Sequence, residues 1–337
     1  MQTIWKTRLK RLLALAAALL VLNLFCYWYY NPTAYVREES RATDVVREPG
    51  AFTSRAKEGF AAAVMDANGY NNASVPGEGE IYALMMGASH TEGLNVAQHE
   101  TTSARLSAYL SAAGVQGSAY NIGISSHMLP RNAANLRRAL ERFRPTAYVV
   151  IETPDVMLYQ SAVEDAMNDG FERIEETRLP FAAVSNQPLS KALYRQWMSL
   201  NGAGEEEDAA PMVITDEMLA LYEAALTELF GQMRATAQEF GVELIIYYHP
   251  HLALQPDGSA LPQTDAGCLE AFSSACDAAG VRFLDMTGHF LSAYGQEHIL
   301  PHGFANTAPG AGHLNAHGCD MVARALAEIM LGGEAGA

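Results

Sequence analysis

Short apolar runs alternate along most of the chain with longer segments whose apolar residues recur at helical spacing. The apolar runs predict β-strands over residues 81–87, 118–125, 147–153, 242–250 and 281–287. The longer segments predict helices over residues 101–114, 131–144, 216–240, 265–279 and 315–331. Strands that alternate with helices in this way form a parallel sheet covered by helices on both faces. The pattern therefore predicts one three-layer α/β/α domain.

The N-terminal pattern differs, because residues 12–30 are apolar apart from Asn23. Their length is near the roughly 20 residues that a helix needs to cross a bilayer. Residues 1–11 hold four basic residues and no acidic one, which predicts a cytoplasmic tail and an extracytoplasmic remainder. We therefore expect an uncleaved, single-pass signal anchor in the cell membrane. The alternatives are a cleaved signal peptide, a lipoprotein modified at Cys26 and a buried soluble helix. The absence of a small-x-small site after the run disfavours the cleaved signal peptide, and the bulky Phe25 disfavours the lipoprotein.

The remaining chain is divided by composition. Residues 31–79 are predicted to be a linker with a helical stretch over residues 52–66, followed by a segment rich in Gly, Asn and Pro. The α/β domain is predicted over residues 80–333. Residues 160–212 interrupt the alternation of strands and helices, are polar and contain GAGEEED, so we expect an insertion or lid there.

Charge and cysteine content exclude some classes of function. The 337 residues carry 22 basic and 38 acidic side chains, a net charge of −16, which disfavours nucleic acid as a partner. At 49% hydrophobic and 18% charged residues, the composition is that of an ordinary globular protein. The four cysteines include no CxxC pair, so neither a zinc site nor a disulfide framework is predicted, and no cofactor is expected.

A serine and a histidine at opposite ends of the predicted domain are the candidate catalytic pair. Ser89 follows the strand that begins at residue 81, in the run IYALMMGASHTEG, and the carboxyl ends of such strands carry the sites of open α/β sheets. His313 lies in GHLNAHG, just before the last predicted helix. Nucleophile and base are usually far apart in sequence and meet only through the fold. The pair predicts Ser89 as a nucleophile and His313 as its base.

The run of motifs resembles the SGNH/GDSL hydrolase family. GASHTEG, NIGIS, a strand ending in a turn and GHLNAHG match the family's blocks in order, over residues 80–331. The resemblance implies a flavodoxin-like α/β/α fold and hydrolysis of esters, including acetyl groups on sugars, with acyl transfer in some members. It also implies that the backbone N–H groups of Ser89 and Gly123 stabilise the oxyanion.

Three positions depart from the family's blocks. Ala88 stands where the family usually has Asp, and Pro154 stands where an Asn side chain would complete the oxyanion hole. Thr153 or a residue of the insertion is a candidate replacement for that Asn. Gly310 stands where the family has the Asp that orients the histidine. A triad without that carboxylate loses the group that sets the imidazole tautomer.

Several groups are candidates to orient His313 or line the cleft. Glu152 at a strand end, Asn306 or a backbone carbonyl could hold the ring, and a bare Ser–His dyad held by a carbonyl is slightly favoured over Glu152. His90, beside the nucleophile, is expected to line the cleft without reacting. His249 and His251, in YYHPHL, are expected in a substrate-facing loop, and no third ligand is evident that would make this pair a metal site.

These observations leave two readings of function. The first is a membrane-anchored, extracytoplasmic serine esterase or O-acyltransferase acting on acyl, most simply acetyl, esters of cell-envelope glycans. The second is a catalytically inactive SGNH-like module that binds a glycan or another envelope partner, since three of the family's polar residues are missing. A soluble lipase is a third reading, which the apolar N-terminal segment disfavours.

Overall fold

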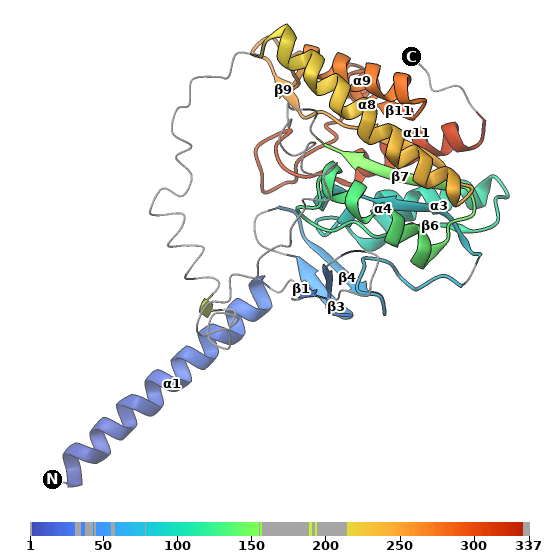
Figure 1. The fold of residues 1–337 in the computed structure, drawn as a ribbon. Coiled ribbons are helices and arrows are strands. Elements are labelled where there is room, and N and C mark those ends of the chain that lie inside the picture. The colour runs from blue at the N-terminus through green and yellow to red at the C-terminus, as the bar shows by residue number, and fades with distance from the viewer. Residues whose placement is uncertain are drawn as a thin grey trace.

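In this computed structural model, a sheet of five parallel strands forms the centre of the α/β part (Figure 1). The structure describes residues 2–30, 35–37, 43, 45–54, 58–77, 79–154, 156, 189–190, 193 and 214–332. The strands are β5 (Ile81–Met86), β6 (Ser118–Asn121), β7 (Tyr148–Thr153), β8 (Glu243–Tyr248) and β11 (Arg282–Asp285). Their order is β11-β8-β7-β5-β6, with every pair parallel. This is the flavodoxin-like order, in which the chain reverses direction across the sheet beside β5.

Helices cover both faces of the sheet, as the alternation of strands and helices predicts. One layer contains α4 (Leu129–Phe143), α8 (Asp216–Glu239) and α9 (Ala266–Ala279), and the other contains α3 (Thr102–Ala112), α10 (Thr287–Glu297) and α11 (Ala316–Met330). Alternate residues of β8 enter opposite cores: Ile246 packs with the first layer and Ile245 with the second, and both are fully buried. Because successive strand side chains point to opposite faces, a strand buried on both sides is apolar throughout.

The helix boundaries follow capping chemistry. The side chain of Thr215 accepts a hydrogen bond from the Met218 N–H at the start of α8. At the start of α9, the side chain of Asp265 accepts one from the Cys268 N–H. Asn315 accepts from two backbone N–H groups at the start of α11. Each cap replaces hydrogen bonds that the first turn of a helix cannot make internally. These caps place the start of α11 directly after the loop that carries His313.

The segment before the α/β domain does not form the helix predicted over residues 52–66. It contains β3 (Gly50–Ser54) and β4 (Ala61–Met65), an antiparallel pair in which Phe52 lies opposite Ala63. Residues 61–65 are buried and exposed in strict alternation, with Ala61, Ala63 and Met65 inward. The helix prediction was wrong because helix propensity, even that of alanine, is a weak preference that pairing with a neighbouring strand outweighs.

Smaller elements complete the described chain. The strands β1 (Tyr35–Arg37) and β2 (Val45–Arg47) pair antiparallel, as do β9 (Leu252–Leu254) and β10 (Ala260–Pro262). The helix α2 (Ser89–Glu92) follows β5, and a 3₁₀ turn, η1, spans Gln98–Glu100. The sequence patterns predicted neither two-stranded sheet. The predicted insertion or lid over residues 160–212 lies almost wholly outside the described residues.

The N-terminal helix α1 (Gln2–Tyr30) projects away from the α/β part in Figure 1. Within it, Ile4–Cys26 has a mean hydropathy of 2.0, and only 6% of its most apolar window is buried against the rest of the molecule. The helix is long and apolar enough to cross a membrane, as a signal sequence near an N-terminus also is. Its exposed apolar side chains show that it does not belong to the protein core.

Candidate active site

Ser89 begins α2 at the carboxyl end of β5, on a turn that a buried carboxylate supports. Glu152 Oε2 accepts hydrogen bonds from the Ala88 N–H at 3.0 Å, the Thr91 N–H at 2.9 Å and the Thr91 hydroxyl at 2.5 Å. Glu152 is fully buried at the end of the neighbouring strand β7. A carboxylate that accepts several donors is compensated for its burial. Glu152 therefore positions the backbone on either side of the nucleophile.

The turn also requires glycine at position 87. A Cβ on Gly87 would lie 2.2 Å from Thr91 Oγ1 and 2.4 Å from Glu152 Oε2, which is closer than any side chain tolerates. The absence of a side chain lets Glu152 reach under the turn. Glycine at position 87 is thus a steric requirement of this site.

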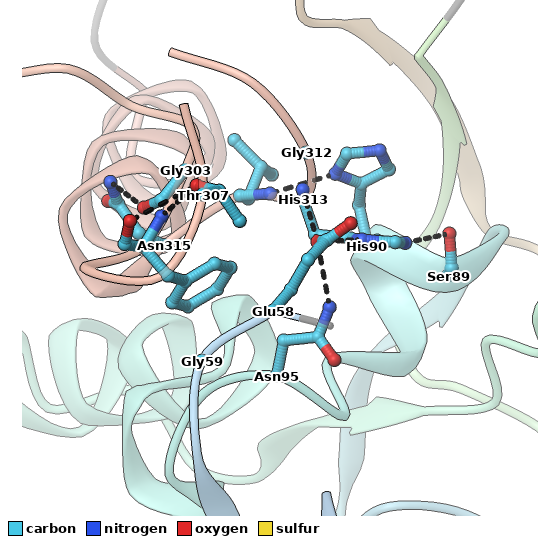
Figure 2. Close-up of polar contacts among 12 residues, drawn as sticks. Glu58, Gly59, Ser89, His90, Asn95, Gly303, Thr307, Gly312, His313 and Asn315 are labelled. Carbon is cyan, nitrogen blue, oxygen red and sulfur yellow. Dashed lines mark hydrogen bonds and ion pairs between the residues drawn. The ribbon is translucent and has the colours of Figure 1, made fainter. Parts of the chain in front are cut away.

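His313 lies between Ser89 and a second carboxylate, that of Glu58 (Figure 2). The Ser89 hydroxyl lies 2.7 Å from His313 Nε2, and His313 Nδ1 lies 2.5 Å from Glu58 Oε2. Because a carboxylate only accepts, the Nδ1–H donates to Glu58, which leaves Nε2 free to accept the serine proton. Glu58 Oε2 also accepts from the His313 backbone N–H at 2.8 Å. Ser89, His313 and Glu58 have the connectivity of a nucleophile, a base and an orienting acid.

Glu58 is the site residue that sequence reasoning missed. It lies between β3 and β4, in the stretch predicted to be helical, and its carboxylate bonds to His313 Nδ1, the contact left open by glycine at position 310. The Asn95 side chain donates to Glu58 Oε2 at 3.2 Å. Gly312 also makes room for Glu58, because a Cβ there would lie 2.8 Å from the Glu58 carboxyl carbon. A lone Glu-Gly pair carries no local signature, so only tertiary contacts reveal this role.

Several polar contacts hold the segment from β2 to β4 against the rest of the domain. Gly59, in the left-handed region at a φ of +61°, donates its N–H to Asn306 Oδ1 at 2.9 Å. Arg47, at the end of β2, forms a buried ion pair with Glu92, the last residue of α2. Glu92 Oε2 also accepts from the Ser125 N–H at 3.0 Å. These contacts tie the segment that carries Glu58 to the short helix that carries Ser89.

Two proposed ways of orienting His313 are therefore wrong. Glu152 contacts the turn around Ser89 and His249, and no contact joins it to His313 among the described residues. The favoured alternative, a bare dyad held by a carbonyl, is also excluded, because the Nδ1 atom is bonded to Glu58. Asn306 acts one step away: it holds Gly59 rather than the imidazole.

The structure also changes the expected oxyanion hole. The Gly123 N–H donates to Asn121 Oδ1 at 2.8 Å, so this donor is already bonded. A Cβ on Gly123 would lie 2.6 Å from the Glu92 nitrogen, so this glycine permits close packing against α2. Thr153 is buried within β7 and pairs with Tyr248, while Pro154, which follows it, lines the cleft. Of the three expected donors, the Ser89 N–H alone remains a candidate in this arrangement.

A cleft of about 670 Å³ opens beside Ser89. Its apolar wall includes Met128, Pro154, Val156 and Ile214, from the loops at the carboxyl ends of β6 and β7 and before α8. Its polar lining consists of Ser126, Tyr248, His251, Gln263, Thr264 and Asp265. Ligand clefts commonly combine an apolar wall with a few placed polar groups. The size and lining suit a small acyl chain attached to a polar alcohol.

Four further histidines lie beside the Ser89–His313 pair. His90, which lines the cleft as expected, accepts the Leu314 N–H at its Nδ1, at 3.0 Å. His249 is fully buried, bonded to Glu152 and His302, so the substrate-facing position expected for it is wrong. His251 lines the cleft and stacks on His302 with ring centroids 4.2 Å apart. Burial lowers the pKa values of His90, His251 and His302, which keeps these rings neutral near pH 7.

Comparison with known proteins finds similarity only among solved structures. No known family model matches the sequence, and no curated protein matches it significantly. A variant of the acetyl xylan esterase Axe2 from Geobacillus stearothermophilus is 16% identical, with a TM-score of 0.42, and covers 77% of this chain and 97% of its own. LAE5, an alpha/beta hydrolase from the metagenome of Lake Arreo in Spain, is also 16% identical, with a TM-score of 0.40. The match covers 76% of this chain and 99% of LAE5. The lipase Lip_vut3 from a goat rumen metagenome is 8% identical, with a TM-score of 0.40, over 76% of this chain and all of its own. Similarity at this level does not establish a function, which must be argued from the geometry of the site.

Proposed function

We propose that this protein is a serine ester hydrolase in which Ser89 is the nucleophile, His313 the general base and Glu58 the residue that orients the base. The observation that carries the proposal is the continuous chain of contacts from Ser89 Oγ through the His313 ring to Glu58 Oε2, at 2.7 and 2.5 Å. A serine hydroxyl is a weak nucleophile until a neighbouring imidazole accepts its proton. The contacts of Glu58 supply the tautomer of His313 that this step needs.

The proposed reaction has two steps that use the same groups. In the first, Ser89 Oγ bonds to the carbonyl carbon of an ester while its proton moves to His313 Nε2. The tetrahedral intermediate then collapses, the bond to the alcohol oxygen breaks, and His313 returns the proton to the leaving alcohol. In the second step water attacks the acyl-serine, His313 accepts its proton, and the carboxylic acid leaves as Ser89 is re-protonated. A second alcohol in place of water would make the same site an O-acyltransferase.

We further propose acylated cell-envelope glycans, most simply acetylated ones, as the substrates. The apolar residues of the cleft beside Ser89 suit a short acyl group, and the polar residues that also line it suit a hydroxylated alcohol. The apolar run of helix α1, with four basic residues at the N-terminal end of the same helix, supports a single-pass anchor with the α/β part outside the cytoplasm. Such an anchor would hold the site near polymers of the envelope. Protease treatment of intact cells should then digest the α/β domain, and full protection behind a sealed membrane would contradict this topology.

The central test compares the full chain with its Ser89→Ala variant, both purified in detergent, on p-nitrophenyl acetate. We expect hydrolysis by the wild type and a loss of about 10³-fold or more in the variant, because the covalent step is removed. A fluorophosphonate probe should label Ser89 in the wild type alone. Equal rates in the two proteins would rule out Ser89 as the nucleophile.

Binding without catalysis is the alternative that one observation favours. The Asn donor of the oxyanion hole is replaced by Pro154, and the Gly123 N–H is already bonded. Removing one oxyanion donor typically costs about 10²–10³ in rate. A folded wild type that retains acetylated glycans but neither hydrolyses esters nor reacts with the fluorophosphonate would establish this binding role instead.

A further inference from the structure

Three histidines near the proposed nucleophile, two of them buried, converge on one another. His90, His249 and His302 each offer a ring nitrogen, and these three nitrogens lie within 4.8 Å of one another. His249 and His302 are 0% and 1% exposed, and they come from different parts of the chain: the end of β8 and the loop before α11. We propose that these three side chains form a Zn²⁺ site, and that Zn²⁺ bound there inhibits the proposed hydrolase. The binding part of this proposal stands without the proposed function, whereas the inhibition rests on it.

The spacing of two of the nitrogens fits tetrahedral zinc. His249 Nδ1 and His302 Nε2 lie 3.3 Å apart. Zinc binds imidazole nitrogen at about 2.0–2.1 Å in a tetrahedral arrangement, which places neighbouring ligand atoms about 3.3–3.4 Å apart. With His90 as the third ligand, the fourth position is left for water, as in zinc sites with three protein ligands.

The surroundings of His249 prepare it as a ligand. Its Nε2 lies 3.2 Å from Glu152 Oε1, and both side chains are fully buried. A carboxylate only accepts, so Nε2 carries the proton and Nδ1 presents a lone pair toward His302. Metal-binding histidines usually donate their second N–H to a carboxylate or carbonyl in this way.

His302 must change tautomer to bind zinc through Nε2. In the absence of metal its Nε2–H donates to His249 Nδ1, and its Nδ1 has no hydrogen-bond partner among the described residues. Moving the proton from Nε2 to Nδ1 breaks the hydrogen bond to His249 Nδ1 and leaves a buried Nδ1–H without an acceptor among the described residues, so zinc binding must outweigh both costs. Zinc would replace that bond with two coordinate bonds. Burial lowers the pKa values of His90 and His302, which leaves both rings unprotonated near neutral pH.

Coordination by His90 links the zinc site to the proposed catalytic base. His90 Nδ1 accepts the Leu314 N–H, so the neutral ring carries its proton on Nε2. If His90 binds zinc through Nε2, the proton moves to Nδ1, which then repels the Leu314 N–H. If it binds through Nδ1, the lone pair is taken from the Leu314 N–H. Either way, zinc binding breaks the hydrogen bond that holds the residue next to His313.

A second connection runs through the backbone of His302. This residue and Leu314 form an isolated antiparallel bridge, and the Gly303 N–H donates to the His313 carbonyl at 3.0 Å (Figure 2). A shift of His302 toward zinc is therefore transmitted to the segment that carries His313. Both connections predict that zinc weakens the Ser89–His313 hydrogen bond, and the result is inhibition.

The test measures binding and activity separately on the metal-free full chain. Equilibrium dialysis against Zn²⁺ with atomic emission should give about one Zn²⁺ per wild-type chain, and bound Co²⁺ should show the intense visible bands of a four-coordinate site. Hydrolysis of p-nitrophenyl acetate should fall with the same midpoint as binding and recover with EDTA. His302→Phe, which keeps a ring beside His251, should weaken Zn²⁺ binding by at least about 100-fold, more than loss of a supporting contact does. The exposed His99→Gln is the matched control and should leave the Zn²⁺ affinity unchanged.

Each outcome bears on a separate part of the proposal. Wild type that binds no Zn²⁺ overturns the site, and Zn²⁺ binding without inhibition overturns the coupling to His313. Inhibition that persists in His302→Phe would place the metal elsewhere, for example on His313 and Glu58, and would also overturn it. If His302→Phe does not fold, by circular dichroism, His90→Phe provides the same comparison at a less buried ring. If the wild type lacks esterase activity, dialysis and the Co²⁺ spectrum still decide the site, while inhibition falls with the proposed function.

Discussion

Replacement of Glu58 by glutamine tests most directly whether the β3–β4 segment completes an active site. The carboxylate contacts His313 at both Nδ1 and the backbone N–H, and it also accepts from Asn95. Glutamine keeps the size and one acceptor oxygen but removes the negative charge. Its amide can also donate to Nδ1, which would favour the tautomer that carries its proton on Nε2. That tautomer cannot accept the Ser89 proton.

The expected magnitude follows from the charge that develops on the ring. A carboxylate about 4 Å from an imidazolium stabilises it by about 4 kcal/mol at an effective dielectric of 20. The His313 and Glu58 side chains are 30% and 22% exposed, so solvent screening lowers this figure. At 1.36 kcal/mol per factor of ten, we expect kcat to fall by about 10²–10³-fold. KM should change little, because the charge on His313 develops only in the transition state.

The assay is steady-state hydrolysis of p-nitrophenyl acetate, with circular dichroism to verify folding. Glu48→Gln is the matched control, because Glu48 belongs to the same N-terminal segment and is exposed to solvent; it should retain wild-type kcat. Glu58→Asp should lose less than Glu58→Gln, because it keeps the charge. A folded Glu58→Gln variant within about threefold of the wild-type kcat would refute the orienting role. The reasoning would also fail if Glu48→Gln lost as much activity.

Two further predictions concern stability. Replacing Arg47 by Met should lower the free energy of unfolding in urea by about 3–5 kcal/mol, because the Glu92 carboxylate, 1% exposed, would lose its cation. The same change at Arg282, which pairs with Glu243 on the surface, should cost less than about 1 kcal/mol. Equal costs for the two variants would contradict the argument. Burial raises the pKa of the Cys319 thiol from 9.0 to about 11, so its contribution to stability is present below pH 9 and is lost as the pH rises toward 11. Between pH 8 and pH 11, the free energy of unfolding measured with urea should therefore fall less for Cys319→Ala than for the wild type. An equal fall in the two proteins would refute the raised pKa of Cys319.

Most of the α/β domain could be predicted from the sequence because its signals are local. The strand of residues 147–153 and its neighbours are apolar runs, which both faces of a covered parallel sheet demand. The helices carry their boundaries in the same way, through caps such as Asn315 and stops such as Gly241 and Gly280. The β3–β4 hairpin was missed because Ala61–Met65 is rich in alanine, and its alternation of buried and exposed residues appears only against a partner strand.

The same division holds within the site. The sequence by itself determined that a serine after β5 and a histidine before α11 should meet, because parallel strands bring their carboxyl ends to one edge of a sheet. Only the tertiary structure decided which carboxylate orients that histidine. Glu152 lies at the expected edge of the sheet, yet it supports the turn around Ser89. Glu58 instead contacts the ring from the loop between β3 and β4, which the hydrogen bond from Gly59 to Asn306 holds in place. Strand-end positions are set by local patterns, whereas the choice between two carboxylates depends on long-range packing that leaves no local signature.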